Sequence, residues 1–423
     1  MPTDQPETRL RERLSLFAYG AAASALRPLV PRHLQKRVRQ GKEDPHRWGE
    51  KLGRQSVARP EGPLVWLHAV GLGETMALRG IIAGIHLRWP AARFLATSTT
   101  LASARLFEQN LPPRTIHQFL PLDVPAYVRR FLDHWQPDIS IWTEQDLWPT
   151  FIDAVSRRDI PLALINARIS PESAHRRGRF PAIFRAMMGS FNVIYAQNRE
   201  TAEFLRRFRA DKVGVVGAVK SLGPALAASE ADLVHLRSLT EGKFIWVGAS
   251  THAADEEVLI AAQLALRQHL PDAILVIVPR DPQRGPSVVD RAKDAGLVSA
   301  DTFASSEGIF VDSRFGTLGL WYRLADAAFI GGTMDEVEGH NPWEAIAVGC
   351  PVLHGPRVRN FDIDFRTLVD ARAAHLCTSA EEVVTALLDR EALTDLAQAG
   401  TMCREKQQRN FDKMFDDIVR LAE

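Results

Sequence analysis

The stretch PLVWLHAVGLGETMALRGIIAGIHLRW, residues 63–89, contains the pattern that decides the fold class. Its first eight residues are mostly apolar, with valine and tryptophan among them, as in a strand buried on both faces. A short loop with two glycines follows, and residues 74–89 then place apolar side chains three and four positions apart. That spacing is typical of a helix with one face on a core. A strand, a glycine turn and a helix predict one unit of a parallel sheet covered by helices.

The same alternation continues along most of the chain. Further strand-like runs occupy 93–99, 115–121, 138–144, 161–168, 192–198 and 212–218, and a second series occupies 243–249, 273–279, 308–313, 326–332 and 351–355. Residues 221–240 show no strand pattern and have Gly and Pro near their start, which indicates a connection between domains. We therefore predict an α/β protein of two Rossmann-like domains facing a cleft, with ligands at the carboxyl ends of the strands. The predicted ranges are an N-terminal segment 1–59, a first domain 60–222, and a second domain 223–423 ending in amphipathic helices.

Length and composition exclude several classes of protein. The chain has 423 residues, of which 46% are hydrophobic and 24% charged, as in ordinary globular proteins rather than disordered, collagen-like or coiled-coil chains. This length predicts two domains, at about 100–200 residues each. Because 52 Lys and Arg balance 51 Asp and Glu, a general nucleic-acid binder is not expected. Three cysteines without metal-ligand spacing predict neither a disulfide framework nor a structural zinc site, and indicate a reducing compartment.

The N-terminal segment differs from the rest of the chain in its charge. Residues 27–59 contain ten Lys and Arg but only three Asp and Glu. Just before them, LSLFAYGAAASAL (14–26) is uncharged, but its thirteen residues are too few for a bilayer core, which needs about 20. We predict a helix in the interface of an anionic membrane, with the basic residues beside it. The alternatives are a cleaved signal peptide, which the helical spacings after it disfavour, and a helical hairpin packed on the body with a solvated basic face.

In the first domain, acidic residues follow two of the predicted strands. Glu74 comes after Gly71 and Gly73 and opens a helix, while Glu144 and Asp146 come at the end of the run 138–144. Carboxylates at strand ends are candidates for acid–base catalysis or for binding a cation. Each also has a purely structural interpretation, because an acid in a first helical turn stabilises the helix dipole and an acid just before a helix can cap it.

In the second domain, two strand-end loops carry residues suited to an anion. The segment 248–252 combines small residues, the hydroxyls of Ser250 and Thr251, and a helix N-terminus. After the next strand, Arg280 and Arg284 are placed where guanidinium groups could grip a phosphate or a carboxylate.

A third loop, 339–344, carries His340 and Glu344. Glu344 could accept hydrogen bonds from ribose hydroxyls or serve only the helix dipole, and a lone histidine such as His340 is more often a structural hydrogen bonder than a base. No P-loop, zincin or serine-hydrolase motif occurs. The residues alone therefore indicate a two-domain enzyme for a phosphorylated ligand such as a nucleotide.

Taken in order, these loops resemble those of the 3-deoxy-D-manno-oct-2-ulosonic acid (Kdo) transferases, the lipid A glycosyltransferases. GKEDPHRWGEKLG (41–53) is similar to the family's GKE…R..ER.G segment, and WLHAVGLGETMA (66–77) to its W.HAVS.GE block. Further blocks follow in the family's order: FLPLDVP (119–125), TEQDLWP (143–149), NARIS (166–170), GAVK (217–220), ASTH (249–252), VPRDPQR (278–284), GTLGLWY (316–322), GHNPWE (339–344) and HGPRVRNF (354–361). The resemblance covers nearly the whole chain, and the ordered set is far more specific than any one block.

The resemblance implies a GT-B glycosyltransferase with an N-terminal membrane-associated helical segment. It implies transfer of Kdo from the donor CMP-Kdo to a lipid A precursor, lipid IVA, in the biosynthesis of the lipopolysaccharide inner core. The reaction would take place at the cytoplasmic face of the inner membrane, on an anionic surface, without a metal or another cofactor and without a nucleic-acid partner.

The resemblance also implies roles for individual residues. By position, Glu74 matches the family's general base, and Glu144 and Lys220 match residues that support the transition state. The family's CMP-binding loops match Pro279, Arg280, Phe315, Gly316, Thr317, Asn341, Pro342, Trp343 and Glu344. Ser250 and Thr251 of the segment 248–252 are expected to add partners for the donor's phosphate or carboxylate.

The sequence departs from the family pattern at several positions. Asp146 replaces the second acid of the ETE block, Ala218 the asparagine of GNLK, Asp281 the histidine of PRHP, and Thr317 the acid of MGEL. These departures leave two alternatives, a GT-B enzyme that uses another nucleotide sugar and a non-catalytic paralogue that binds lipid A precursor or nucleotide. Retention of Glu74 counts against the second alternative, because a binding protein does not need a base.

Overall fold

The computed structural model describes residues 6–69, 72–144, 146–169, 173, 179–208 and 213–423. It divides into two compact units, residues 1–219 with 409–423 (unit 1) and residues 220–408 (unit 2). The predicted ranges placed all of 223–423 in one domain, whereas the contacts of residues 409–423 are made with unit 1. The physical reason is that residues 409–423 bury apolar side chains within unit 1, among them Phe411 and Phe415.

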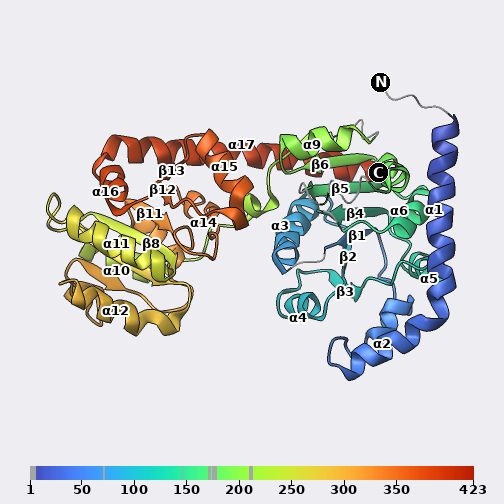
Figure 1. The fold of residues 1–423 in the computed structure, drawn as a ribbon, viewed down its shortest axis with the longest axis horizontal. Coiled ribbons are helices and arrows are strands. Elements are labelled where there is room, and N and C mark those ends of the chain that lie inside the picture. Colours follow the sequence, from blue (N-terminus) through green and yellow to red (C-terminus); the bar gives the residue numbers. More distant parts are fainter. Residues whose placement is uncertain (1–5, 70–71, 145, 170–172, 174–178, 209–212) are drawn as a thin grey trace. The chain divides into compact units, whose positions relative to one another are not determined.

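Unit 1 is built on a parallel sheet whose strands lie in the order β3-β2-β1-β4-β5-β6-β7. The strands are β1 (Leu64–His68), β2 (Arg93–Ser98), β3 (Thr115–Phe119), β4 (Ile139–Thr143), β5 (Leu162–Ala167), β6 (Val193–Ala196) and β7 (Val213–Val215). Helices lie on both faces of the sheet (Figure 1). They are α1 (Pro6–Leu26), α2 (Val30–Arg39), α3 (Leu72–Arg88), α4 (Leu101–Asn110), α5 (Pro125–Trp135), α6 (Pro149–Ser156), α8 (Pro181–Ser190) and α9 (Arg199–Arg206).

Unit 2 has a second parallel sheet, in the order β10-β9-β8-β11-β12-β13. Its strands are β8 (Ile245–Thr251), β9 (Ile274–Pro279), β10 (Ile309–Val311), β11 (Ala327–Ile330), β12 (Val352–His354) and β13 (Ala374–Leu376). Its helices are α10 (Glu230–Thr240), α11 (Ala253–Leu266), α12 (Gly285–Asp294), α13 (Leu318–Leu324), α14 (Trp343–Ile346), α15 (Asp362–Asp370), α16 (Ala380–Leu388) and α17 (Arg390–Ala422). The prediction of two parallel α/β sheets is confirmed, and all the predicted strands are present. β13 was not predicted, because it has three residues and two of them are exposed.

Aromatic side chains fill the centre of unit 1. The ring of Trp66 on β1 lies 4.9 Å from Phe131, 5.4 Å from Trp142 and 5.6 Å from Phe151, measured between ring centroids. All four side chains are fully buried. The apolar run that predicted β1 is therefore the middle of a core contributed by β1, β4, α5 and α6.

Helix α1 packs against α5, α6 and α8. Its Tyr19 hydroxyl donates to Asp123, whose carboxylate also accepts the backbone N–H groups of Thr150 (3.0 Å) and Phe151 (3.1 Å) at the start of α6. Burial raises the pKa of Asp123, and these hydrogen bonds oppose that shift. Asp123 thus joins α1 to the body of unit 1. Among the described residues, every helix is too short or too polar to cross a bilayer.

Part of the basic segment 27–59 is held inside unit 1 by ion pairs. Lys51 lies 2.5 Å and Arg37 2.6 Å from the buried carboxylate of Glu43. Arg47 pairs with the buried Glu50 at 3.0 Å. These three charges are therefore structural, and the exposed basic residues of the segment are Arg27, Arg32, Lys36, Arg39, Lys42 and Arg54.

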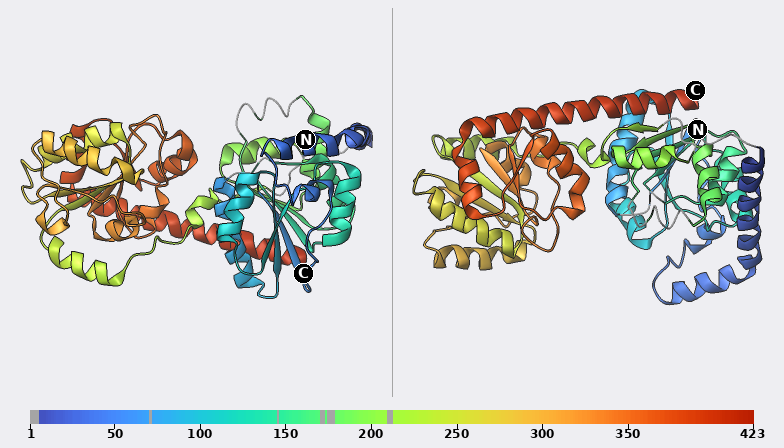
Figure 2. Two further views of the ribbon diagram at one scale, coloured as in Figure 1. Left: turned by 90° about the horizontal axis from the view of Figure 1, so that it is seen from below. Right: turned by 45° about the horizontal axis from the view of Figure 1, so that its top comes forward.

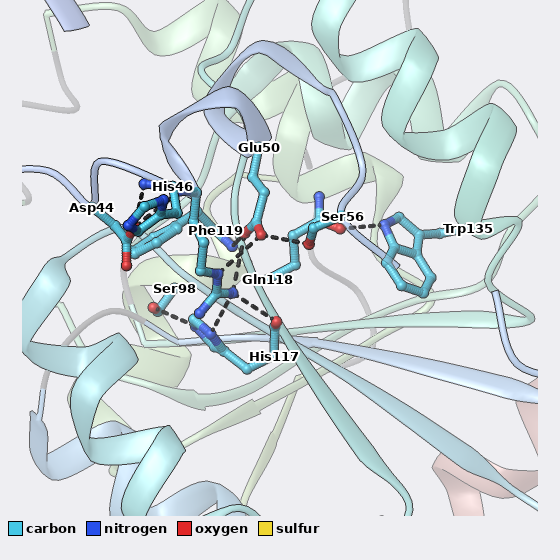
Figure 3. A network of polar contacts seen from close by, with 10 residues as sticks. Asp44, His46, Glu50, Ser56, Ser98, His117, Gln118, Phe119 and Trp135 are labelled. Carbon is cyan, nitrogen blue, oxygen red and sulfur yellow. Dashed lines mark hydrogen bonds and ion pairs between the residues drawn. The ribbon is translucent and has the colours of Figure 1, made fainter. Parts of the chain in front are cut away.

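Glu50 and His117 connect this segment to β3 (Figure 3). Glu50 accepts hydrogen bonds from Ser56 Oγ (2.7 Å) and from the backbone N–H of Phe119 (2.8 Å). Burial, and secondarily the nearby Arg47 guanidinium, lowers the pKa of His117 to about 3, so its ring is neutral at ordinary pH. His117 Nδ1 then accepts from Arg47 at 3.1 Å, and Nε2 donates to Ser98 Oγ at 2.9 Å.

The C-terminal end of α17, one continuous helix in Figure 2, packs on α3. Phe415 is buried to 2% exposure, and a Cβ on Gly84 would come within 2.3 Å of its ring. Arg88 lies over the same ring, 5.4 Å from its centroid, and pairs with Asp412 at 2.8 Å and Asp416 at 2.5 Å. Helix α17 can therefore approach α3 this closely only because Gly84 has no side chain.

We expect Phe415→Ala to lower the free energy of unfolding of unit 1 by about 3–5 kcal/mol, because it leaves a cavity beside Gly84. Lys413→Ala, at an exposed position in the part of α17 that belongs to unit 1, should change it by less than about 0.5 kcal/mol. Urea denaturation followed by circular dichroism measures both values. Equal effects of the two substitutions would show that this contact does not stabilise the unit.

Candidate active site

The predicted catalytic acids of unit 1 follow the carboxyl ends of β1 and β4. Glu74 is the third residue of α3, just after the β1 loop, and its side chain lies outside the described residues. Glu144 follows β4 directly, and its backbone N–H donates to the carbonyl of Ile165 on the neighbouring strand at 3.2 Å. Sheet order therefore brings the loops that carry the two acids to one edge of the sheet, because β1 and β4 are neighbours.

Glu144 is held in an unusual conformation. Its φ is 56° and that of Asn166, at the end of β5, is 53°, both in the left-handed region. Such a conformation is unfavourable for a residue with a side chain and persists only where the surroundings impose it. The Asn166 amide donates to Glu144 Oε1 at 3.2 Å, and its Oδ1 accepts the backbone N–H of Val219 at 3.1 Å. Asn166 thus fixes the Glu144 carboxylate relative to the end of unit 1.

Lys220 follows Val219 in the chain and belongs to unit 2. It lies in a short 3-10 turn, Val219–Leu222, and its ammonium lies 3.9 Å from the centroid of the Phe361 ring. A cation over an aromatic face is stabilised without losing its charge. The lysine is therefore held in place by Phe361, which lies in the block 354–361.

In unit 2, Asp255 in the first turn of α11 organises the loops after β8 and β11. Its carboxylate accepts the backbone N–H groups of His252 (2.9 Å), Gly332 (2.6 Å) and Met334 (2.9 Å). Burial raises the pKa of Asp255, and these three donors oppose the shift. The two loops approach so closely that a Cβ on Gly331 would lie 2.4 Å from the carbonyl oxygen of Ser250.

Two histidines meet above this junction. His252 Nε2 and His340 Nε2 are 2.9 Å apart, so one ring donates and the other accepts. Burial lowers the pKa of His340 to about 4, and the charges of His252 and Arg280 contribute in the same direction. His340 is therefore neutral at ordinary pH and is available as a hydrogen-bond partner rather than as a cation.

Arg280 is the guanidinium that remains available for an anion in the loop 278–284. Its backbone N–H donates to the carbonyl of Thr251 at 3.1 Å, its side chain is exposed, and it pairs with no acid among the described residues. Arg284 is instead committed to the fully buried Glu256 at 2.6 Å. The carboxylate of Asp281 accepts the backbone N–H of Gln283 at 3.0 Å and caps the following turn.

The loop 339–344 places Asn341 against Glu344. The Asn341 amide donates to Glu344 Oε1 at 3.4 Å, while its Oδ1 accepts the backbone N–H of Trp343 at 3.1 Å. Burial raises the pKa of Glu344, and the Asn341 hydrogen bond and the Arg280 charge oppose this. Because Arg280 acts on both His340 and Glu344, these residues share one electrostatic environment.

Several predicted ligand-binding residues do not present their side chains at the surface. Thr251 is fully buried and donates to Glu256, Pro279 is buried, and the Trp343 indole donates to Asp364 inside the core at 2.7 Å. These residues can contact a ligand only through the backbone. Ser250 is partly exposed and has a φ of 55°. Pro342 is the N-cap residue of α14.

Phe315, Gly316 and Thr317 form a separate exposed loop before α13. The Phe315 side chain is 90% exposed, Gly316 has a φ of 85°, and Thr317 donates to the carbonyl of Arg314 at 3.3 Å. Arg314 is fixed by Asp312, with contacts of 2.8 and 2.9 Å. The loop base is therefore rigid, and the aromatic ring projects from it.

The sequence-based list of site residues omitted Asn166, Asp255 and His252. Asn166 lies in the block NARIS (166–170). Asparagine adopts the left-handed conformation more readily than most residues, and this preference is the property of the sequence that could have indicated its role. From the sequence, Asp255 is an ordinary acid in a first helical turn, and only the structure shows that it also joins two loops. Among the described residues, no group of three His, Cys, Asp or Glu side chains could hold a metal ion.

Comparison with known proteins identifies the family. The family model described as "3-Deoxy-D-manno-octulosonic-acid transferase (kdotransferase)" matches residues 46–222. The 3-deoxy-D-manno-octulosonic acid transferase of Rickettsia felis is 33% identical over 331 residues, covering 77% of this chain and 70% of that protein. A probable mitochondrial 3-deoxy-D-manno-octulosonic acid transferase of Arabidopsis thaliana is 31% identical, covering 96% and 94%. The chain belongs to the Kdo transferase family.

A solved structure supports the fold assignment of this Kdo transferase family member. The glycosyltransferase of Rickettsia africae matches with a TM-score of 0.52 and 12% identity, covering 85% of this chain and 99% of that one. At this identity the likeness shows the fold alone. It supports the GT-B assignment of two Rossmann-like units.

The raised pKa of Glu344 predicts a pH-dependent stability. A group whose folded-state pKa is raised contributes stability that is complete below its unfolded pKa and is lost as the pH rises through the folded value. We expect Glu344→Gln, which keeps the acceptor for Asn341, to become progressively more stable relative to wild type as the pH rises above about 4.3, the ordinary pKa of a glutamate. Urea denaturation at several pH values measures the difference. A difference independent of pH would contradict the prediction.

Proposed function

We propose that this protein transfers Kdo from CMP-Kdo to a lipid A precursor, lipid IVA, in the synthesis of the lipopolysaccharide inner core. The observation that carries the proposal is the 33% identity with a protein named 3-deoxy-D-manno-octulosonic acid transferase over 77% of this chain. The retained residues Glu74, Glu144, Lys220 and Arg280 support it, because each lies in a strand-end loop or directly after one. The reaction needs no metal.

Glu74 acts as the general base in this proposal. An acceptor hydroxyl is too weakly acidic to attack the sugar unaided, and a carboxylate within hydrogen-bond reach removes its proton as the bond forms. Glu144, fixed by Asn166, and Lys220, held over Phe361, stabilise the charge that develops.

The donor binds to unit 2. Arg280 takes the phosphate or the sugar carboxylate, with the partly exposed Ser250 beside it. In this proposal Asn341 and Glu344 bind the nucleotide's hydroxyl groups, and the ring of Phe315, which is 90% exposed, contacts the base. The loop positions that depart from the family pattern, including Thr317, favour a second candidate function, that of a GT-B enzyme that uses another nucleotide sugar.

The N-terminal helix mediates contact with the cytoplasmic face of the inner membrane in this proposal. Leu10, Leu14 and Phe17 are 57%, 56% and 73% exposed, and their spacing places them on one face of α1. Exposed apolar side chains beside exposed basic residues suit an anionic membrane interface. The other face of α1 is packed on unit 1, so the helix rests on the membrane rather than crossing it.

The base is tested by measuring CMP release from freshly generated CMP-Kdo, with and without lipid IVA. We expect acceptor-dependent release in wild type and a loss of about 10²–10⁴-fold in Glu74→Ala. Glu61→Ala, at an exposed position before β1, is the control and should behave as wild type. CMP binding without release in wild type would exclude CMP-Kdo as donor and favour another nucleotide sugar. Binding of lipid IVA or CMP without turnover of any donor would favour the non-catalytic alternative.

Membrane contact is tested with point substitutions, because deleting α1 would expose the surface that it covers. We expect Leu14→Ser with Phe17→Ser to weaken binding to vesicles containing anionic lipid by about 10-fold or more, since two apolar side chains are no longer buried. Val234→Ser, at a 61% exposed position on α10, should leave binding unchanged. Co-sedimentation measures the binding, and equal binding by all three proteins would refute the proposal.

A further inference from the structure

A buried histidine at the end of β1, the strand that precedes Glu74, contacts an aspartate in the segment that carries Glu144. His68 is the last residue of β1 and its side chain is completely buried. Its Nε2 lies 2.9 Å from Oδ2 of Asp146, in the loop between β4 and α6. The backbone is joined as well, because Thr143 Oγ1 donates to the carbonyl of His68 at 2.9 Å.

The surroundings of His68 Nδ1 determine its protonation. This nitrogen faces the carbonyl oxygen of Thr97 at 3.1 Å and Thr97 Oγ1 at 3.0 Å. The carbonyl can only accept. The Thr97 hydroxyl oxygen accepts the Trp66 indole N–H at 2.9 Å and can donate its own proton to the carbonyl of Leu67 at 3.3 Å, which leaves a lone pair to accept from the ring. His68 Nδ1 therefore carries a proton.

The surroundings of Asp146 determine the state of the other ring nitrogen. The same oxygen that faces His68 Nε2 also accepts the indole N–H of Trp148 at 2.8 Å. An indole can only donate, and a donor to a carboxyl oxygen stabilises the ionised carboxylate more than the protonated acid, whose hydroxyl oxygen is the weaker acceptor. The shared proton then lies on His68 Nε2, which makes the ring an imidazolium.

We propose that His68 and Asp146 form a net-neutral imidazolium–carboxylate pair that positions the end of β1, which leads toward Glu74, and the segment after β4, which carries Glu144, for sugar transfer. This inference rests on the proposed function. This pair of opposite charges, in which His68 is buried and the Asp146 side chain is 34% exposed, adds no net charge near Glu144, whereas an unpaired Asp146 would add a second negative charge two residues away. Both members act through the loops that they hold, so they are positioning residues rather than catalytic ones.

The charge state is tested without any assay of activity. Nuclear magnetic resonance of protein labelled with ¹⁵N-histidine reports which ring nitrogens of His68 carry protons, and His68→Asn identifies the signal by its loss. We expect both nitrogens to be protonated in wild type and Nε2 to lose its proton in Asp146→Asn. A neutral His68 ring in wild type would overturn the imidazolium assignment. This result stands whatever the donor or acceptor proves to be.

The positioning role is tested by the kinetics of Kdo transfer. This test requires that wild type transfers Kdo. If it does not, the result counts against the proposed function and not against the His68–Asp146 pair. We expect Asp146→Asn to lower kcat by about 10–100-fold, because displaced loops misplace the reacting groups. The KM for CMP-Kdo should stay within about 2-fold of wild type, since the donor loops belong to unit 2.

Two further variants complete this test. Asp146→Glu restores the carboxylate and should recover most of the lost kcat. Its kcat can be compared with that of wild type even if Asp146→Asn does not fold. Asp153→Asn, on α6 but paired with the exposed Arg157, is the matched control and should keep wild-type kcat. An unchanged kcat in a folded Asp146→Asn, or equal losses in Asp146→Glu and Asp146→Asn, would overturn the positioning role.

Discussion

Burial of both faces of each sheet is the constraint on which the rest of this structure depends. Every residue of β1 and β4 is buried, and so is every residue of β9. Such strands have no surface on which a polar side chain could meet a ligand. The chemistry must therefore lie where the chain leaves the sheet, and that is where Glu144, Asp146 and Arg280 occur. Because each buried strand leads directly into the residues at its end, the same stretches of sequence predicted both the strands and the site.

The strand ends are held by side chains that satisfy backbone groups across neighbouring loops. Asp255 accepts N–H groups from two loops of unit 2, and Asn166 joins Glu144 to Val219 in unit 1. Left-handed conformations at Glu144 and Ser250 cost of order 1–3 kcal/mol each. A loop that adopts them without a glycine is held by its neighbours, so these groups are placed before any ligand arrives. Such preorganisation is what electrostatic stabilisation of a transition state requires.

Periodicity predicted the two sheets well, because long apolar runs alternate with helical spacing throughout. It did not predict β13, whose three residues lie at a sheet edge with little burial. It also could not show which way a strand-end side chain points: Thr251 and Trp343 face the core, whereas Arg280 faces solvent. Asn166 was missed because its partners, Glu144 and Val219, are adjacent to it only through the sheet order. The sequence also could not show that Arg47 and Lys51 are structural charges. Their buried partners, Glu50 and Glu43, lie in the same short segment, but only the folded chain shows which basic residues form the ion pairs.

The structure also changes the meaning of one departure from the family pattern. An acid at position 281 looks adverse beside a phosphate, yet the Asp281 carboxylate is occupied by the N–H of Gln283 and caps a turn. Glu256 neutralises Arg284, and His340 is uncharged because burial lowers its pKa to about 4. Within these loops the charge left for a ligand is that of Arg280, so the field at the strand ends favours an anion despite the nearby acids. An anionic nucleotide sugar is therefore compatible with the loop 278–284 as it stands, and Asp281 by itself does not require a different donor.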